Sequence, residues 1–195
     1  MILITFEQGD RETFAAAFDD ENQVDQFLSL IPGYSKEEGS FEDADYVLES
    51  IDPTKIPDYL EIEFNGNVWP ISRHMFVGDE RVDVNYYRVP NLSIENQGMV
   101  DGFTRVDAYV VENAEVKTYI EQREEAFMRA KSILESLGYK VARDFTGSED
   151  GEAVLYAKAD SDEFYILEYL DPQFIEIASR EDDSFEAWIK HQIEI

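Results

Sequence analysis

Residues 59–71 carry the clearest structural signal in the chain and read YLEIEFNGNVWPI. In the first half of this stretch, acidic side chains alternate with apolar ones, which is typical of a strand with one buried face. The dipeptide Asn65–Gly66 follows, and it is strongly favoured in two-residue hairpin turns. We therefore expect a β-hairpin whose return strand covers residues 68–76. That strand lies at a sheet edge or carries a bulge, because Pro70 cannot donate a hydrogen bond to the ladder.

Before this hairpin the sequence predicts one strand, at residues 1–6, followed by helices. Residues 10–31 predict two short helices separated near Asp19, with Asp20 as the N-cap of the second. Residues 40–52 predict a further helix, because apolar residues recur at helical spacing and Ser40 is a good N-cap. On that helix one exposed face would carry Glu42, Asp45, Tyr46 and Glu49.

After the hairpin, Val82, Val84 and Tyr86 predict a third strand, and residues 91–102 have the composition of a connector. A strand at 103–111 and a long helix at 114–137, closed by Gly138, follow the connector. The remaining predictions are four strands, at 139–145, 152–159, 164–170 and 174–178, and a final helix at 184–193. The fold class is therefore α+β, with two small lobes that each pack an antiparallel sheet against one or two helices. Their predicted boundaries are 1–95 and 100–195.

The chain is strongly acidic, with 44 Asp and Glu against 16 Lys and Arg in 195 residues and a net charge of -28. This charge argues against direct binding to DNA, RNA or an anionic membrane, because phosphate groups need a cationic surface, and it predicts a basic partner. The absence of cysteine removes disulfides and thiolate chemistry, so the cytoplasm is the expected compartment. No apolar run approaches the length of a membrane span.

The negative charge is concentrated rather than uniform. Residues 10–52 contain 13 acidic and two basic residues, whereas residues 114–137 contain five acidic and four basic residues. Such a dense patch repels itself, so we interpret it as a candidate partner-binding surface, although acidic surfaces also serve solubility alone. The candidate partner-binding residues are Asp20, Glu21, Asp25, Glu42, Asp45, Tyr46 and Glu49.

The sequence offers little support for catalysis. Its two histidines, His74 and His191, lie on different predicted elements, and no nucleophile, zinc or nucleotide motif accompanies them. The pattern at residues 57–63 resembles a metal-dependent nuclease core in outline, but Glu63 stands where that chemistry needs a lysine. We therefore expect no enzyme activity, no cofactor and no metal.

These observations lead to one main hypothesis and two alternatives. The protein would be a non-catalytic inhibitor that occupies the basic groove of a nucleic-acid-binding or nucleic-acid-cutting protein, such as a nuclease, by imitating nucleic acid. Anti-restriction and anti-CRISPR proteins form such a functional class, and the analogy is one of charge. The first alternative is an immunity protein that neutralises a basic nuclease toxin. The second is a structural or assembly domain with a solvated acidic surface.

Overall fold

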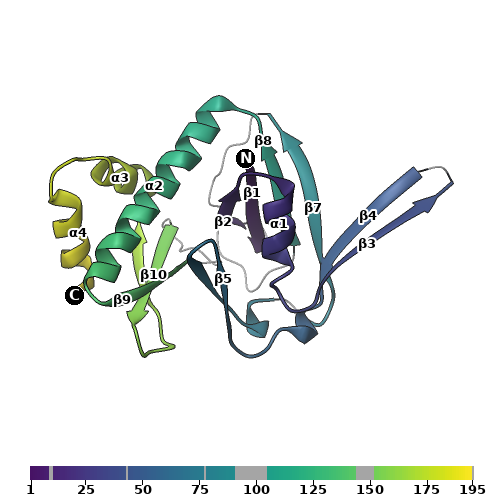
Figure 1. Cartoon of the computed structure of the whole chain (residues 1–195), viewed down its shortest axis with the longest axis horizontal. Coiled ribbons are helices and arrows are strands. Elements are labelled where there is room, and N and C mark those ends of the chain that lie inside the picture. The colour runs from purple at the N-terminus through teal and green to yellow at the C-terminus, as the bar shows by residue number, and fades with distance from the viewer. Residues whose placement is uncertain (9–10, 43, 77, 91–104, 144–151, 195) are drawn as a thin grey trace.

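The computed structural model describes residues 1–8, 11–42, 44–76, 78–90, 105–143 and 152–194. Within these residues the chain forms four α-helices and eleven β-strands, arranged as one large sheet and two smaller ones (Figure 1). The predicted α+β class is confirmed, and the arrangement is consistent with two lobes. No helix in the described ranges is long and apolar enough to span a membrane.

The large sheet has six strands in the order β2-β1-β8-β7-β4-β3. Its neighbouring strands run antiparallel except for β7 and β8, which run parallel and so depart from the all-antiparallel expectation. A parallel pair needs a crossover connection rather than a tight turn. The predicted connector at 91–102 joins these two strands and lies outside the described residues. The strands are β1 (Ile2–Gln8), β2 (Arg11–Phe18), β3 (Tyr34–Phe41), β4 (Ala44–Ile51), β7 (Val82–Val89) and β8 (Arg105–Val111).

Two smaller sheets and the helices complete the fold. The first small sheet is a hairpin of two strands, and the second has three strands in the order β11-β10-β9. These strands are β5 (Leu60–Phe64), β6 (Asn67–Ile71), β9 (Tyr139–Arg143), β10 (Glu152–Lys158) and β11 (Tyr165–Tyr169). The helices are α1 (Glu21–Leu28), α2 (Ala114–Ser136), α3 (Asp171–Ala178) and α4 (Ser184–Ile193), with 3-10 turns η1 (Pro53–Lys55) and η2 (Arg73–Met75).

The β5–β6 hairpin has the turn that its sequence predicts. Asn65 and Gly66 both have positive φ, 48° and 74°, and the strands pair up to Phe64 opposite Asn67. A type I′ turn requires positive φ at both central positions, which Asn and Gly adopt at low cost. The predicted hairpin and its turn are therefore confirmed, but the return strand ends at Ile71 and η2 occupies part of the range predicted for it.

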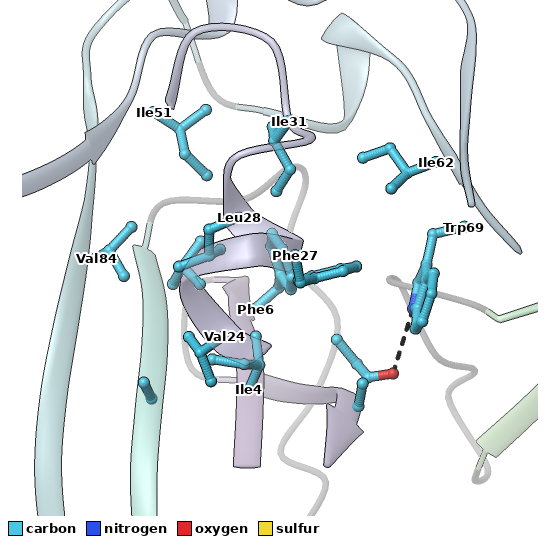
Figure 2. Close-up of a cluster of buried hydrophobic side chains, with 14 of the residues drawn as sticks. Ile4, Phe6, Val24, Phe27, Leu28, Ile31, Ile51, Ile62, Trp69 and Val84 are labelled. Atoms are coloured by element: carbon cyan, nitrogen blue, oxygen red, sulfur yellow. Dashed lines mark hydrogen bonds between the residues drawn. The ribbon is translucent and has the colours of Figure 1, made fainter. Parts of the chain in front are cut away.

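The main core lies between α1 and one face of the large sheet (Figure 2). Val24, Phe27 and Leu28 of α1 are fully buried there. The side chain of Trp69, from β6, closes this core with its ring centroid 4.8 Å from that of Phe27. Its indole N–H donates to the carbonyl of Ala15 at 3.4 Å, shown as the dashed line in Figure 2. A smaller cluster on the opposite face of the sheet includes residues from the first half of α2.

A second core lies between the C-terminal half of α2, helices α3 and α4, and the three-stranded sheet. The two cores meet at Arg143, whose guanidinium forms a two-pronged ion pair with Glu124 at 2.8 and 2.6 Å. The same guanidinium lies 3.9 Å from the ring centroid of Phe127 and 5.9 Å from that of Trp69. Cation–π contacts of this kind strengthen when they are shielded from water. Arg143 therefore links the three-stranded sheet to α2 and to β6.

The first of the two helices predicted within residues 10–31 is wrong. Residues 11–18 form strand β2, in which Ala16 pairs with Ile4 and Phe18 pairs with Ile2. Alanines favour a helix in isolation, but pairing with β1 buries Ala16 and Phe18 in the main core, so tertiary contacts override the local preference. The second helix is correct as α1, and the Asp20 side chain caps it by accepting from the backbone N–H of Gln23.

The helix predicted at 40–52 is also wrong, because this segment completes strand β3 and forms β4. The apolar spacing of Ala44, Val47, Leu48 and Ile51 fits a helix, and these four residues show no two-residue alternation that would indicate a strand. Cross-strand pairs with residues 34–41 decide the matter, including the oppositely charged pair Lys36 and Glu49. The single exposed helical face proposed for Glu42, Asp45, Tyr46 and Glu49 therefore does not exist.

The strand predicted at 174–178 is wrong as well, since these residues end helix α3. Pro172 lies in the first turn of α3, where its fixed φ favours a helix start. Phe174 and Ala178, four residues apart, are both buried. The long helix and the final helix are confirmed as α2 and α4.

The strand expected to open the second lobe, β8, lies between β1 and β7 in the centre of the large sheet. Both of its faces are covered, and Val106, Asp107 and Ala108 are all fully buried. The packing of the C-terminal elements against one another begins with α2 rather than with β8. The division of the chain into 1–95 and 100–195 remains a prediction.

We predict that Phe27→Ala lowers the free energy of unfolding by about 3–5 kcal/mol, because it leaves a cavity beneath Trp69. Urea denaturation followed by tryptophan fluorescence measures this change. The matched control is Phe41→Ala, whose ring is 70% exposed and whose loss should change stability by about 0.5 kcal/mol or less. Equal effects of the two substitutions would contradict the packing described here.

Candidate partner-binding surface

The β3–β4 hairpin extends away from the body of the protein (Figure 1). Its two strands pair along their whole length, from Tyr34 opposite Ile51 to Phe41 opposite Ala44. By contrast, β4 pairs with β7 only through residues 49–51. Among the described residues, the part from 37 to 48 therefore pairs only with itself. We call this part the outer hairpin.

The pairing register sorts the side chains of the outer hairpin onto two faces, because directly paired residues point to the same side of a sheet. The acidic face consists of Glu38, Ser40, Asp45 and Val47. The apolar face consists of Glu37, Gly39, Phe41, Ala44, Tyr46 and Leu48. Exposure on the apolar face is high, at 70% for Phe41 and 59% for Leu48. The outer hairpin thus presents Glu38 and Asp45 beside Val47 on one side, and three large apolar groups beside Glu37 on the other.

Gly39 and Tyr46 form a cross-strand pair on the apolar face. A Cβ atom at position 39 would collide with the ring and hydroxyl of Tyr46. The absence of a side chain at Gly39 therefore lets the Tyr46 ring lie across β3. This contact positions Tyr46 while leaving 45% of it exposed.

A groove of about 530 Å³ lies at the base of the hairpin and is lined by residues of α1, β3, β4 and β7. The Lys36 ammonium sits there, 2.8 Å from a carboxylate oxygen of Asp25 and 3.5 Å from one of Glu49. The Glu49 carboxylate is buried, and it accepts a hydrogen bond of 2.6 Å from the Tyr34 hydroxyl. These contacts fasten the hairpin to α1.

Burial and the carboxylates of the groove together shift the pKa of three neighbouring side chains. Burial raises the pKa of Tyr34, and its hydrogen bond to Glu49 raises it further. Burial also raises the pKa of Tyr86, and the Glu49 and Asp25 carboxylates add to the shift. The hydrogen bond to Asp25 raises the pKa of Lys36 and outweighs the opposing effect of burial. Lys36 therefore stays charged, and both tyrosines stay neutral, at pH values well above those at which these side chains usually lose their proton.

The structure separates the seven candidate residues into two groups and a helix cap. Glu21, Asp25 and Glu49 come together around the groove. Asp45 and Tyr46 lie on opposite faces of the outer hairpin, and Glu42 occupies its turn with a positive φ of 47°. Asp20 caps α1. Glu49 is a buried structural group, which differs from the exposed position expected for it.

Sequence reasoning missed the residues that give the hairpin its two faces. Glu38 and Leu48 were not singled out, although both lie in the dense acidic stretch. The signal that identifies them is the complementarity of residues 34–41 and 44–51, which places Lys36 opposite Glu49 only in one antiparallel register. A helical interpretation of residues 40–52 hides this register.

The two histidines occupy separate, exposed sites. His74 lies in η2, rather than on the predicted strand, and its ring is hydrogen-bonded to the Ser72 hydroxyl. His191 lies near the end of α4. Within the described parts of the chain, no group of three or more His, Cys, Asp or Glu residues could hold a metal ion.

We predict that Tyr34→Phe lowers the free energy of unfolding by about 1–3 kcal/mol near pH 7, because the buried Glu49 carboxylate loses its hydrogen-bond donor. The folded state raises the pKa of Tyr34, so this contribution is present below the ordinary tyrosine pKa of 10.0 and is lost as the pH rises above it. Urea denaturation at pH 7, 9 and 11 should show that the gap in unfolding free energy to the unsubstituted protein is unchanged at pH 9 and narrows by about 1 kcal/mol at pH 11. Tyr46→Phe serves as the control and should show no gap; a gap for Tyr34→Phe that is independent of pH would argue against this assignment.

No family model, no curated protein and no solved structure matches this chain.

Proposed function

We propose that the protein is a non-catalytic inhibitor that binds the basic groove of a nucleic-acid-binding or nucleic-acid-cutting protein, with the outer hairpin as the inserted element. The observation that supports this proposal is the extension of the hairpin beyond β7 with its carboxylates exposed. An element that leaves the body of a protein and pairs only with itself is free to enter a groove.

Electrostatics favour a basic partner. Glu38 and Asp45 occupy diagonal positions on the acidic face, where neighbouring residues lie about 7–8 Å apart and their Cβ atoms lie somewhat closer. Arginine side chains that bind phosphates also bind carboxylates, through two-pronged, charge-assisted hydrogen bonds. The net charge of -28 adds a long-range attraction that accelerates encounter with a cationic surface. Imitation of nucleic acid on this surface therefore comes from strand carboxylates rather than from a helical row.

The apolar face adds a requirement on the partner. The exposed apolar side chains of this face are uncharged and cannot form ion pairs with arginines that bind phosphate. Their transfer out of water into an interface is favourable; they are Phe41, Tyr46 and Leu48. Aromatic side chains at the centre of an interface often supply most of its binding energy. The partner groove that fits this hairpin has one basic wall and one apolar wall.

The same apolar face favours the alternative of an assembly domain, in which these side chains alone make the contact. The two functions respond oppositely to salt. Binding through the acidic face weakens as ionic strength rises, because salt screens exposed charges, whereas purely apolar binding holds or strengthens. The immunity-protein alternative shares the electrostatics of the main proposal and differs in the identity of its partner.

We predict that the double substitution Glu38→Lys and Asp45→Lys weakens partner binding by about 100-fold or more, because each arginine contact becomes a repulsion. The measurement starts with affinity capture from a lysate of the source cells at 50 mM and 500 mM salt. The captured protein is then purified, and its affinity for this chain is measured by calorimetry, alone and in the presence of duplex DNA or RNA. We expect nucleic acid and this chain to compete.

The matched control reverses two exposed carboxylates on α2, Glu121→Lys and Glu125→Lys, which changes the net charge by the same amount away from the hairpin. This control should keep most of the affinity. Glu49 is left intact because its substitution would disturb the base of the hairpin. A captured protein that tolerates nucleic acid, or whose binding depends on Tyr46 and Leu48 but not on salt, would sink the mimicry proposal and favour the assembly domain.

A further inference from the structure

Strand β11 forms one edge of the three-stranded sheet, far along the chain from the outer hairpin. Among the described residues, its only strand partner is β10. Tyr165 and Ile166 are 55% and 57% exposed, and Leu170, directly after the strand, is 50% exposed. Within the described ranges this edge therefore has no second strand partner, and large apolar side chains flank it.

Sheet edges are normally protected against pairing by charged side chains, bulges or proline. The β3 edge of the large sheet follows this pattern, because Lys36, Glu37 and Glu38 run along it. In contrast, β11 reads YILEY and carries a single charge, at Glu168. Its pairing with β10 is regular from end to end. Of these two edges, β11 is the one suited to accept another strand.

A hollow of about 270 Å³ lies beside the end of this strand. Its walls include Tyr169 and Leu170 together with Phe174 and Trp188 from helices α3 and α4. The Tyr169 and Phe174 rings stack with centroids 3.7 Å apart, which fixes the wall shared by the strand and α3. The hollow is large enough for an aliphatic side chain, and Glu168, Gln173 and Gln192 line it together with these apolar groups.

The charges around β11 indicate which kind of partner segment can bind there. Asp160, Asp162 and Glu163 precede β11, and Glu168 lies within it, all of them exposed. The nearby Lys140 is already engaged, 2.8 Å from a carboxylate oxygen of Glu61. This acidic surround attracts a cationic segment and repels a second copy of a chain that carries a charge of -28. A segment that contains basic and apolar residues therefore fits this edge better than a second copy of this chain does.

We propose that β11 is a docking site for an extended segment of a partner protein, in which basic and apolar residues alternate. The segment adds a fourth strand to the three-stranded sheet, with main-chain hydrogen bonds supplying affinity and one apolar side chain filling the hollow. Its lysines or arginines lie beside the acidic residues that surround the strand. This site is separate from the outer hairpin and does not depend on the function proposed for it.

The test uses the full chain and a seven-residue peptide of alternating lysine and valine as the probe, at 150 mM salt. We expect chemical-shift changes and slowed amide exchange confined to β11 and its neighbours, measured by NMR. Ile166→Lys should weaken binding about tenfold or more, because it places a like charge at the edge. Met128→Lys is the matched control, since Met128 is 46% exposed on α2, and it should bind as the unsubstituted chain does.

Two further peptides separate strand pairing from charge. The same peptide with every backbone amide N-methylated keeps its charge but loses its ladder donors, so it should bind at least about tenfold more weakly. A glutamate and valine peptide should not bind. Shifts located on the outer hairpin, equal binding of the methylated peptide, or no shifts at all would overturn the proposal. Dimerisation of the chain alone that Ile166→Lys abolishes would also overturn it, because the edge would then pair with a second copy.

Discussion

The indole of Trp69 connects three parts of the chain that are far apart in sequence. It packs edge-on against Phe27 of α1 and donates its N–H to the carbonyl of Ala15. Ala15 is the extra residue of a bulge, since Ile4 pairs with Ala16 while Thr5 pairs with Phe14. A bulge leaves a backbone group outside the ladder, and burial of that group without a partner would be costly. The sheet, the helix and the β5–β6 hairpin therefore depend on one another through this ring.

The C-terminal elements depend on the same ring through Arg143. A buried guanidinium needs both a counter-charge and a surface to cover it, and here Glu124 supplies the first while Phe127 and Trp69 supply the second. Because Arg143 ends β9 and Glu124 lies on α2, the ion pair also fixes how the three-stranded sheet meets the long helix. Two units that each have their own core are in this way held in one arrangement.

Local signals in the sequence predicted elements that local chemistry determines. Asn65 and Gly66 specify a turn whatever surrounds it, and the Asp20 cap and the length of α2 are likewise local properties. Two of the errors occur where pairing with another strand decides, whereas the error at 174–178 overlooks the local helix-start signal of Pro172. Residues 11–18 become a strand only because β1 lies beside them, and residues 44–51 only because β3 does. For the site, the acidic stretch was located from charge alone, whereas its two faces and the burial of Glu49 follow from the register and were not accessible to helical spacing.

The β3–β4 hairpin has a fixed base, and its outer part, the outer hairpin, is free. This combination affects how it binds. At the base, Lys36 joins β3 to Asp25 of α1, and Tyr34 holds the buried Glu49 carboxylate. These contacts set the direction of the hairpin before any partner arrives, so little conformational freedom is lost on binding. The buried Glu49 at the base therefore helps to hold the exposed acidic residues of the outer hairpin in position for binding. An acidic segment without such an anchor would carry the same charge but would lose more entropy when ordered by a partner.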